Sequence, residues 1–340
     1  MENTQRVRRR QRRREWSVIE LGFFGLAVLL ALIMTISGIV RVAGAFAGEK
    51  EKEPPKTVTV GGGQADEGQE ETPQEPDQAP ATDSDLAQYA NDTGYGGKLY
   101  QLMDSNPEAA YILRNLELYP EELLAFVTRF PEAMAYGAAY LDYDRMGLQP
   151  SSDLSDVTSR QSTVDPEVQS VLDSQGVMPL LLQWDSRWGY QTYGDGLLGY
   201  TGCGPTSLSM VSLYLTGWHD NDPYSIAQYA QENGFYTSGS GSAWTLMSQA
   251  SANFGVAATE LPLDENKMIA SLEEGYPVIC AMGPGDFTDN GHYIVLAGYS
   301  DGAFIIRDPN SPINSMRSWT FDEIKDQIKN IWSFKPINSN

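Results

Sequence analysis

The chain contains very little cysteine and histidine. Its 340 residues include two of each, Cys203, Cys280, His219 and His292. So few thiols exclude a small fold held together by several disulfide bonds. Two histidines leave little to build a zinc site, so we predict no metal and no other cofactor. The chain also lacks a Gly-rich loop ending in Lys-Ser or Lys-Thr, which argues against a nucleotide-binding motor.

Positive charge is scarce as well. Lys and Arg number 23 against 45 Asp and Glu, which gives a formal net charge of -22. Because an acidic surface repels phosphate backbones, nucleic acid is not predicted as a partner. Cationic peptides are electrostatically easier substrates for such a chain.

Many of the arginines gather at the N-terminus. Residues 1–15 form a basic arm, and residues 16–40 form an apolar run long enough to cross a bilayer as one helix. Positive charge marks the cytoplasmic side, so the pattern predicts a single-pass anchor with the remainder of the chain outside the membrane. Ala45-Phe46-Ala47 resembles a signal-peptidase site, and secretion after cleavage stays the alternative. The low cysteine content favours a Gram-positive surface.

Composition divides the rest of the chain into four parts. Residues 41–94 are acidic, rich in Pro and Gln and without periodicity, which predicts a disordered linker. Residues 95–150 contain three Pro-Glu steps typical of helix starts, and predict a small helical region. That region can shield an active site, bind substrate or extend a core. Residues 151–169 are polar and predict a second linker, and residues 170–340 have the size of a single catalytic domain.

Cys203 lies where a helix is predicted to begin. It stands in Gly202-Cys203-Gly204-Pro205, and apolar residues then recur at helical spacing until Gly217. Proline suits the first turn of a helix, where its missing N–H costs nothing. The positive end of a helix favours a thiolate over a thiol, so Cys203 is the candidate nucleophile. The two glycines leave room for a carbonyl substrate.

The candidate base is one of the two histidines. His219 lies in a polar connection between predicted helices and is interpreted as a solvated loop residue. His292 opens an apolar, β-rich run over residues 292–299, where a strand can hold it rigidly. We therefore predict that His292 is the base.

A hairpin is predicted to bring a carboxylate to His292. Ser300-Asp301-Gly302 is a turn signal, and the next apolar run returns antiparallel and ends at Asp308. An aspartate there can accept the imidazole N–H and fix its tautomer. Asn310 is the alternative for that role.

These motifs, in this order, resemble the bacteriocin-processing (double-glycine) peptidase family and its papain-like cysteine peptidase relatives. The resemblance covers about residues 177–334 and implies that Cys203 is the nucleophile, His292 the base and Asp308 its orienting group. It also implies that Gln183 donates a hydrogen bond to the oxyanion, together with the backbone N–H of Cys203. Family members commonly form the cytoplasmic end of a peptide exporter, which this chain lacks, so their substrates do not carry over.

The resemblance implies a papain-like α+β fold, with helices packed on an antiparallel sheet. The pattern of the last 170 residues fits, because helices come first and strands afterwards. Beyond the helix of Cys203, the predicted helices cover 222–233, 242–254 and 264–274, and Thr320-Phe321-Asp322-Glu323 is a capping box for a last one. The predicted strands cover 277–282, 292–299, 304–308 and 331–334.

The predicted function is that of a membrane-anchored, extracytoplasmic cysteine peptidase, which hydrolyses peptide or amide bonds through a thioester. The expected partners are a peptide or protein substrate, cell-wall peptides included, and the membrane. A cell-wall peptide hydrolase, a transpeptidase and a surface binding or scaffold protein without turnover stay open. A disulfide between Cys203 and Cys280 would abolish the chemistry, but Cys280 lies in an apolar strand and is predicted to be a free, buried thiol.

Two further clusters have competing interpretations. Asp286, Asp289 and Asn290 match no calcium loop and are interpreted as a turn rather than a cation site. A set of aromatic residues either lines a peptide groove or packs in the core: Trp184, Trp188, Tyr190, Tyr193 and Trp244.

Overall fold

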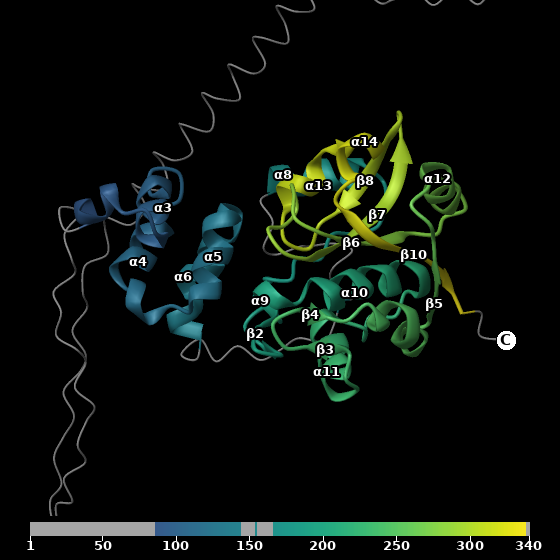
Figure 1. Ribbon diagram of the computed structural model, residues 1–340, viewed down its shortest axis with the longest axis horizontal. Coiled ribbons are helices and arrows are strands. Elements are labelled where there is room, and N and C mark those ends of the chain that lie inside the picture. The colour runs from purple at the N-terminus through teal and green to yellow at the C-terminus, as the bar shows by residue number, and fades with distance from the viewer. Residues whose placement is uncertain (1–85, 144–153, 155–165, 338–340) are drawn as a thin grey trace, which may run out of the picture. The chain divides into compact units, whose positions relative to one another are not determined.

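The structure is a computed structural model that describes residues 86–143, 154 and 166–337 (Figure 1). These residues all belong to one compact unit, Pro76–Asn340. Among them, no helix has the length and the apolar composition that a membrane crossing requires. The predicted basic arm and anchor lie outside the described residues, as do most of the two predicted linkers.

Residues 86–143 form a bundle of short helices, called the helical unit below. Its α-helices are α3 (Tyr95–Leu102), α4 (Glu108–Arg114), α5 (Glu121–Arg129) and α6 (Met134–Ala139), and its 3-10 turns are η1 (Ala87–Asn91), η2 (Leu116–Leu118), η3 (Pro131–Ala133) and η4 (Tyr140–Asp142). Each of the three Pro-Glu steps lies at a helix start, with Pro107 and Pro120 directly before α4 and α5. Leu99, Ile112 and Leu123 are fully buried, so the unit has a core.

Residues 166–337 form an α+β arrangement, as the sequence predicts. Its helices are α8 (Pro166–Ser174), α9 (Leu198–Thr201), α10 (Cys203–Thr216), α11 (Pro223–Glu232), α12 (Glu265–Glu273), α13 (Pro312–Met316) and α14 (Phe321–Ile324), with the π-turn η5 (Leu246–Ala250) and the 3-10 turn η6 (Ser251–Phe254). Local signals explain several starts. Asp222 and Asp264 cap α11 and α12, and Thr320 forms the predicted capping box of α14.

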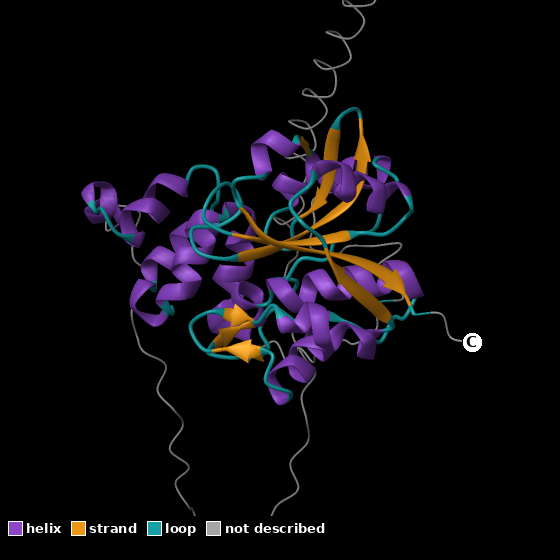
Figure 2. Cartoon of the chain, turned by 45° about the vertical axis from the view of Figure 1, so that its right-hand side comes forward, coloured by secondary structure: helices purple, strands orange, loops and turns teal. Residues whose placement is uncertain are grey.

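One six-stranded antiparallel sheet organises this part of the chain (Figure 2). Its order is β5-β10-β6-β7-β8-β9, formed by Val256–Glu260, Ile328–Pro336, Val278–Met282, His292–Ser300, Ala303–Arg307 and Ser318–Trp319. Two small hairpins lie apart from it, β1 (Thr192–Tyr193) with β2 (Gly196–Leu197), and β3 (Tyr236–Thr237) with β4 (Gly241–Ser242).

The sheet is covered on both faces. Leu208 of α10 packs in the same core as Val295 of the central strand β7, whereas Met268 of α12 packs with Ile294 and Leu296. Successive residues of a strand point to opposite faces, which explains the division of β7 between two cores. Figure 1 shows α10 along one side of the sheet, with α13 and α14 on the other. The helix that begins at Cys203 is therefore pressed against the sheet that carries His292.

The predicted element pattern differs from the structure in several parts, and one of them is η1 (Ala87–Asn91), which lies inside the segment 41–94 predicted as a disordered linker. The predicted helix over 242–254 is wrong at its start, because Gly241–Ser242 is strand β4 and only the later residues turn helically. Strand β5 is absent from the prediction, since Val256 is its only fully buried residue and no alternation marks it. Helix α8 begins at Pro166, inside the segment predicted as the second linker.

Candidate active site

Cys203 is the first residue of α10, preceded by Gly202 at the N-cap. The helix ends at Gly217, whose φ of 70° lies in the left-handed region that glycine adopts easily. Cys203 is a free thiol and is partly exposed. A helix start thus presents an accessible sulfur, as the motif predicts.

The glycines beside Cys203 are required by the packing of the protein itself. A Cβ atom on Gly202 would lie 2.5 Å from the carbonyl oxygen of Leu198, and one on Gly204 would lie 2.5 Å from Oγ of Ser242. Real Cβ atoms do not approach other atoms so closely. The two glycines let α9 and β4 come near the start of α10, a reason that the motif alone does not reveal.

His292 and Asp308 form a buried pair at the open end of the β7–β8 hairpin. Nε2 of His292 lies 2.7 Å from Oδ1 of Asp308, and both side chains are at most 2% exposed. His292 is the first residue of β7, and Asp308 directly follows β8. The hairpin turns at Asp301 and Gly302, with φ values of 54° and 83°. The turn and the juxtaposition agree with the sequence prediction.

The Asp308 carboxylate is fixed by the loop that follows it. The backbone N–H of Asn310 donates to Oδ1 at 2.9 Å, and Nδ2 of Asn314 donates to Oδ2 at 2.8 Å. The backbone N–H of Asp308 itself donates to Oγ of Ser315 at 2.9 Å. Each carboxylate oxygen thus accepts at least one hydrogen bond from the loop, which orients the group toward the imidazole.

Cys203 contributes to the electrostatic surroundings of the imidazole. Burial alone lowers the pKa of His292, but the charge and hydrogen bond of Asp308, together with the influence of Cys203, outweigh it and raise the pKa to about 10. Since Asp308 occupies Nε2, Nδ1 is the ring nitrogen that this carboxylate leaves open. The raised pKa therefore favours a protonated imidazole.

Asn310, the alternative orienting residue, lies on the Nδ1 side. Its Nδ2 is 3.4 Å from Nδ1 of His292, whereas Asp308 holds Nε2. The orienting contact therefore belongs to Asp308. The amide of Asn310 lies instead at the other ring nitrogen.

Gln183 connects the two halves of the site. Its backbone N–H donates to the carbonyl of Pro309 at 2.9 Å, directly after Asp308, and its Nε2 donates to the carbonyl of Gly199 at 3.0 Å, four residues before Cys203. The side chain is buried, and the bond to Gly199 fixes which amide atom is the nitrogen. One N–H of the amide remains for a further acceptor.

The other two candidate residues stand apart from this chemistry. Cys280 lies fully buried in β6 as a free thiol, so the disulfide alternative is not what the structure contains. Burial raises the pKa of its thiol. His219 is partly buried between α10 and α11, and its carbonyl accepts from the N–H of Leu154 at 3.3 Å.

The remaining clusters have simple roles. Asp289 pairs with Arg129 at 2.5 Å, and Asp286 bonds with Gln327. Within residues 86–143, 154 and 166–337, no group of three or more His, Cys, Asp or Glu side chains is placed to hold a metal. Of the five aromatic residues considered for a peptide groove, Trp184, Trp188, Tyr190 and Tyr193 are buried in the core. The fifth, Trp244, is half exposed and packs edge-on against Trp332.

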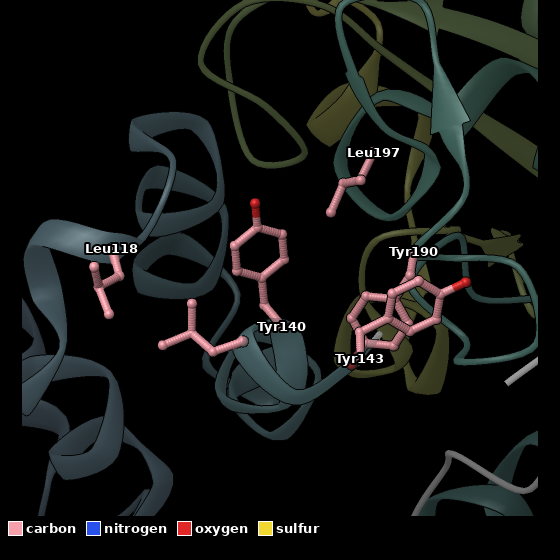
Figure 3. Close-up of a pocket in the computed structure, with 6 residues that line it drawn as sticks. Leu118, Tyr140, Tyr143, Tyr190 and Leu197 are labelled. Atoms are coloured by element: carbon pink, nitrogen blue, oxygen red, sulfur yellow. The ribbon is translucent and has the colours of Figure 1, made fainter. Parts of the chain in front are cut away.

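A cavity of about 490 Å³ lies where the helical unit meets the segment before Cys203 (Figure 3). Tyr143 stacks on Tyr190 at one wall, with ring centroids 4.3 Å apart. The cavity is lined by Leu118, Tyr140, Leu141, Tyr143, Tyr190 and Leu197. Sequence reasoning finds no such cavity, because its walls come from segments far apart in the chain.

Comparison with known proteins agrees with the sequence motifs. Residues 177–335 match the model described as the Peptidase_C39 like family, which confirms the resemblance over this part of the chain. No curated protein matches the chain.

Three solved structures are similar. The peptidase domain of Streptococcus ComA, a bifunctional ABC transporter of a quorum-sensing pathway, is 20% identical, covers 40% of this chain and 93% of its own, and has a TM-score of 0.32. A double glycine motif protease from an AMS/PCAT transporter, solved with the leader peptide, is 22% identical. The match covers 47% of this chain and 92% of that one, with a TM-score of 0.33. A C39-like peptidase from Bacillus anthracis is 20% identical. The match covers 47% of this chain and 96% of that one, with a TM-score of 0.28.

Proposed function

We propose that this chain, whose residues 177–335 match the model of the Peptidase_C39 like family, is a cysteine peptidase with Cys203 as its nucleophile. The observation that supports this best is the arrangement around His292. One ring nitrogen is 2.7 Å from the buried carboxylate of Asp308, and Cys203 is among the groups that raise the pKa of the ring. A nucleophile, a base and an orienting group in this order are the parts of a thiol peptidase.

The proposed reaction proceeds through a thioester. Nδ1 of His292 takes the proton from Cys203, and the sulfur attacks the carbonyl carbon of a peptide bond. The C–N bond then breaks, and the amine leaves with the proton from Nδ1. A water molecule gives a proton to Nδ1 and attacks the thioester, and the C–S bond breaks to release the acid and restore the thiol. Asp308 holds the ring throughout.

Gln183 is the proposed donor to the oxyanion. Its Nε2 has a second N–H besides the one bound to Gly199, and its backbone is held at Pro309. The backbone N–H of Cys203, at the start of α10, is the second donor. A donor of this kind contributes about 3 kcal/mol of transition-state stabilisation.

The proposed place of work is outside the cytoplasm, on a membrane anchor. This rests on the sequence alone, namely the basic arm at 1–15 and the apolar run at 16–40. In intact cells, an external protease should degrade the catalytic domain, and carbonate washing should leave the chain with the membranes. Protection of the domain in intact cells would refute the proposed topology but would not bear on the proposed peptidase reaction.

Labelling with a thiol-alkylating probe tests the nucleophile. We expect iodoacetamide to label the wild-type chain and Cys280→Ala equally, and Cys203→Ala at background, because Cys280 is fully buried. Hydrolysis of a peptide library and of purified wall peptides should then disappear in Cys203→Ala and His292→Ala but persist in His219→Ala. Equal labelling of Cys203→Ala and wild type would count against the proposal. Labelling of Cys203 without turnover of any peptide would favour a binding protein.

A further inference from the structure

The helical unit contacts the loop before His292, the loop after Asp308 and the segment between Gln183 and Cys203. Before His292, Arg129 reaches the loop at 285–289. After Asp308, Glu132 reaches Ser311. Before Cys203, the hydroxyl of Tyr136 donates to the carbonyl of Gly189 at 2.8 Å. Such a distribution is unexpected for a unit that merely enlarges the core.

A chain of hydrogen bonds connects Glu132 with Asp308 of the His292–Asp308 pair. The hydroxyl of Ser311 donates to Oε1 of Glu132. The carbonyl of Ser311 accepts from the hydroxyl of Ser315 at 3.0 Å, and Oγ of Ser315 accepts from the backbone N–H of Asp308 at 2.9 Å. Ser311 is also the N-cap of α13, whose Asn314 donates to Asp308. Glu132 thus holds the residue on which the loop around Asp308 depends.

The contact of Arg129 holds the loop before His292. Its Nη2 donates to the carbonyl of Gly285 at 3.0 Å, and its Nη1 pairs with Asp289 at 2.5 Å. Asp289 is 72% exposed, so the ion pair itself contributes little. Ser311 is only 2% exposed, and its bond to Glu132 is therefore expected to be the stronger of the two contacts.

These contacts are polar bonds at the rim of a cavity rather than packed core. The cavity has a volume of about 300 Å³ and is lined by Arg129, Phe130, Glu132, Asp286, Ser311, Ile313 and Asn314. Side chains that border open space can be changed without leaving a void behind. Burial, reinforced by the nearby charge of Asp308, raises the pKa of Glu132, although its bond to Ser311 opposes this. Glu132 is therefore electrostatically coupled to the site.

We propose that Arg129 and Glu132, at the junction of α5 and η3, are positioning residues that hold the His292 and Asp308 loops and so set the reactivity of Cys203. The inference rests on the proposed function of Cys203 as the nucleophile. It assigns the helical unit a part in the active site, acting through the two loops rather than on the substrate.

The test measures alkylation of Cys203 by iodoacetamide against pH, in the full chain, with Cys203→Ala as background. Glu132→Ala should slow the reaction about tenfold and move the alkaline limb of its pH profile down by about one unit, because a loosened Asp308 stabilises the imidazolium less. Glu132→Gln keeps an acceptor for Ser311, so it should restore both the rate of alkylation and the position of the alkaline limb. Arg129→Ala should cost about threefold, since its ion pair is exposed.

The matched controls are Glu121→Ala and Lys98→Ala, two exposed charges of the helical unit, which should behave as wild type. An unchanged pH profile in Glu132→Ala overturns the inference, and so does a lowered melting temperature without a change of profile. Should Glu132→Ala not fold, the profile of Arg129→Ala decides by the same criterion. If Cys203 of the wild type reacts only as a free thiol in solution does, the proposed function fails, and the inference fails with it.

Discussion

At the scale of single residues, the chemistry depends on the surroundings of His292. The ring is buried, which by itself disfavours its charged form. The carboxylate of Asp308 and the neighbouring Cys203 outweigh that effect and favour the proton. A protonated imidazole next to a thiol favours the thiolate, the form that attacks a carbonyl.

The raised pKa of His292 predicts a pH dependence of stability. The folded value of about 10 exceeds the ordinary 6.5, so the folded state binds the proton more tightly than the unfolded state. The stabilisation is complete below pH 6.5 and is lost as the pH rises toward 10. The free energy of unfolding of the wild type, relative to His292→Gln, should therefore fall across this window in urea titrations. Parallel pH curves for the two chains would contradict the prediction.

Gly204 is predicted to tolerate no side chain. Its added Cβ atom would lie 2.5 Å from Oγ of Ser242, so Gly204→Ala should destabilise the fold by about 1–3 kcal/mol and displace Cys203. Thermal unfolding and the rate of alkylation measure the two effects. Gly291→Ala is the control, because a Cβ atom there meets nothing within 4 Å. A second change, Ser242→Gly, should restore Gly204→Ala, and equal stability of the two alanine variants would refute the argument.

At the scale of elements, the β7–β8 hairpin delivers the base and its carboxylate together. Val295 pairs with Arg307, and the register shifts by one residue between Leu296 and Gly298. A bulge of this kind bends a strand and re-aims the residues beyond it. The end of the hairpin nearest the site is also tied to α8 and the segment after it. Nε of Arg307 donates to the carbonyl of Met178 at 2.8 Å.

Loss of the Arg307 tether should destabilise the fold strongly. The side chain is 1% exposed and also bonds to Gln175 and to the carbonyl of Leu172, so Arg307→Met leaves several buried acceptors unpaired. We expect a loss of about 3 kcal/mol in urea denaturation. Arg317→Met, which breaks only an ion pair whose arginine is 50% exposed, should cost less than about 1 kcal/mol. Similar losses in both would show that Arg307 is no tether.

At the scale of the whole molecule, the helical unit and the residues after 166 share one core. The ring of Tyr136 stacks on that of Tyr190 with centroids 4.5 Å apart, and the hydroxyl of Tyr190 donates to the carbonyl of Tyr136 at 2.9 Å. Both rings are nearly buried. A continuous core joins the two parts, so they are expected to unfold together.

Calorimetry tests this coupling. The chain should unfold its described parts in a single transition, and Tyr136→Ala should split that transition into two, because the shared core is lost at its centre. Tyr214→Ala is the control, since that tyrosine is 45% exposed on α10 and should leave one transition. Two transitions in the wild type would show that the parts fold independently.

The sequence by itself determined the elements whose signals are local. The capping residues Asp222, Asp264 and Thr320 predict their helices, and the turn at Asp301 predicts the hairpin with its register near one residue. Asp308 falls beside His292 for the same reason, since a short turn leaves the returning strand little freedom. Periodicity and turn chemistry act over a few residues, so they can be read without a fold.

Only the tertiary structure decided what meets across long stretches of chain. The bond between Ser311 and Glu132 joins residues 179 positions apart, and no sequence pattern predicts it. The anchoring of Gln183 and the closeness of Ser242 to Gly204 have the same origin. Such contacts follow from how whole elements pack, which depends on the summed burial of many side chains rather than on any local pattern. Whether the sulfur of Cys203 reaches the imidazole of His292 belongs to this second class.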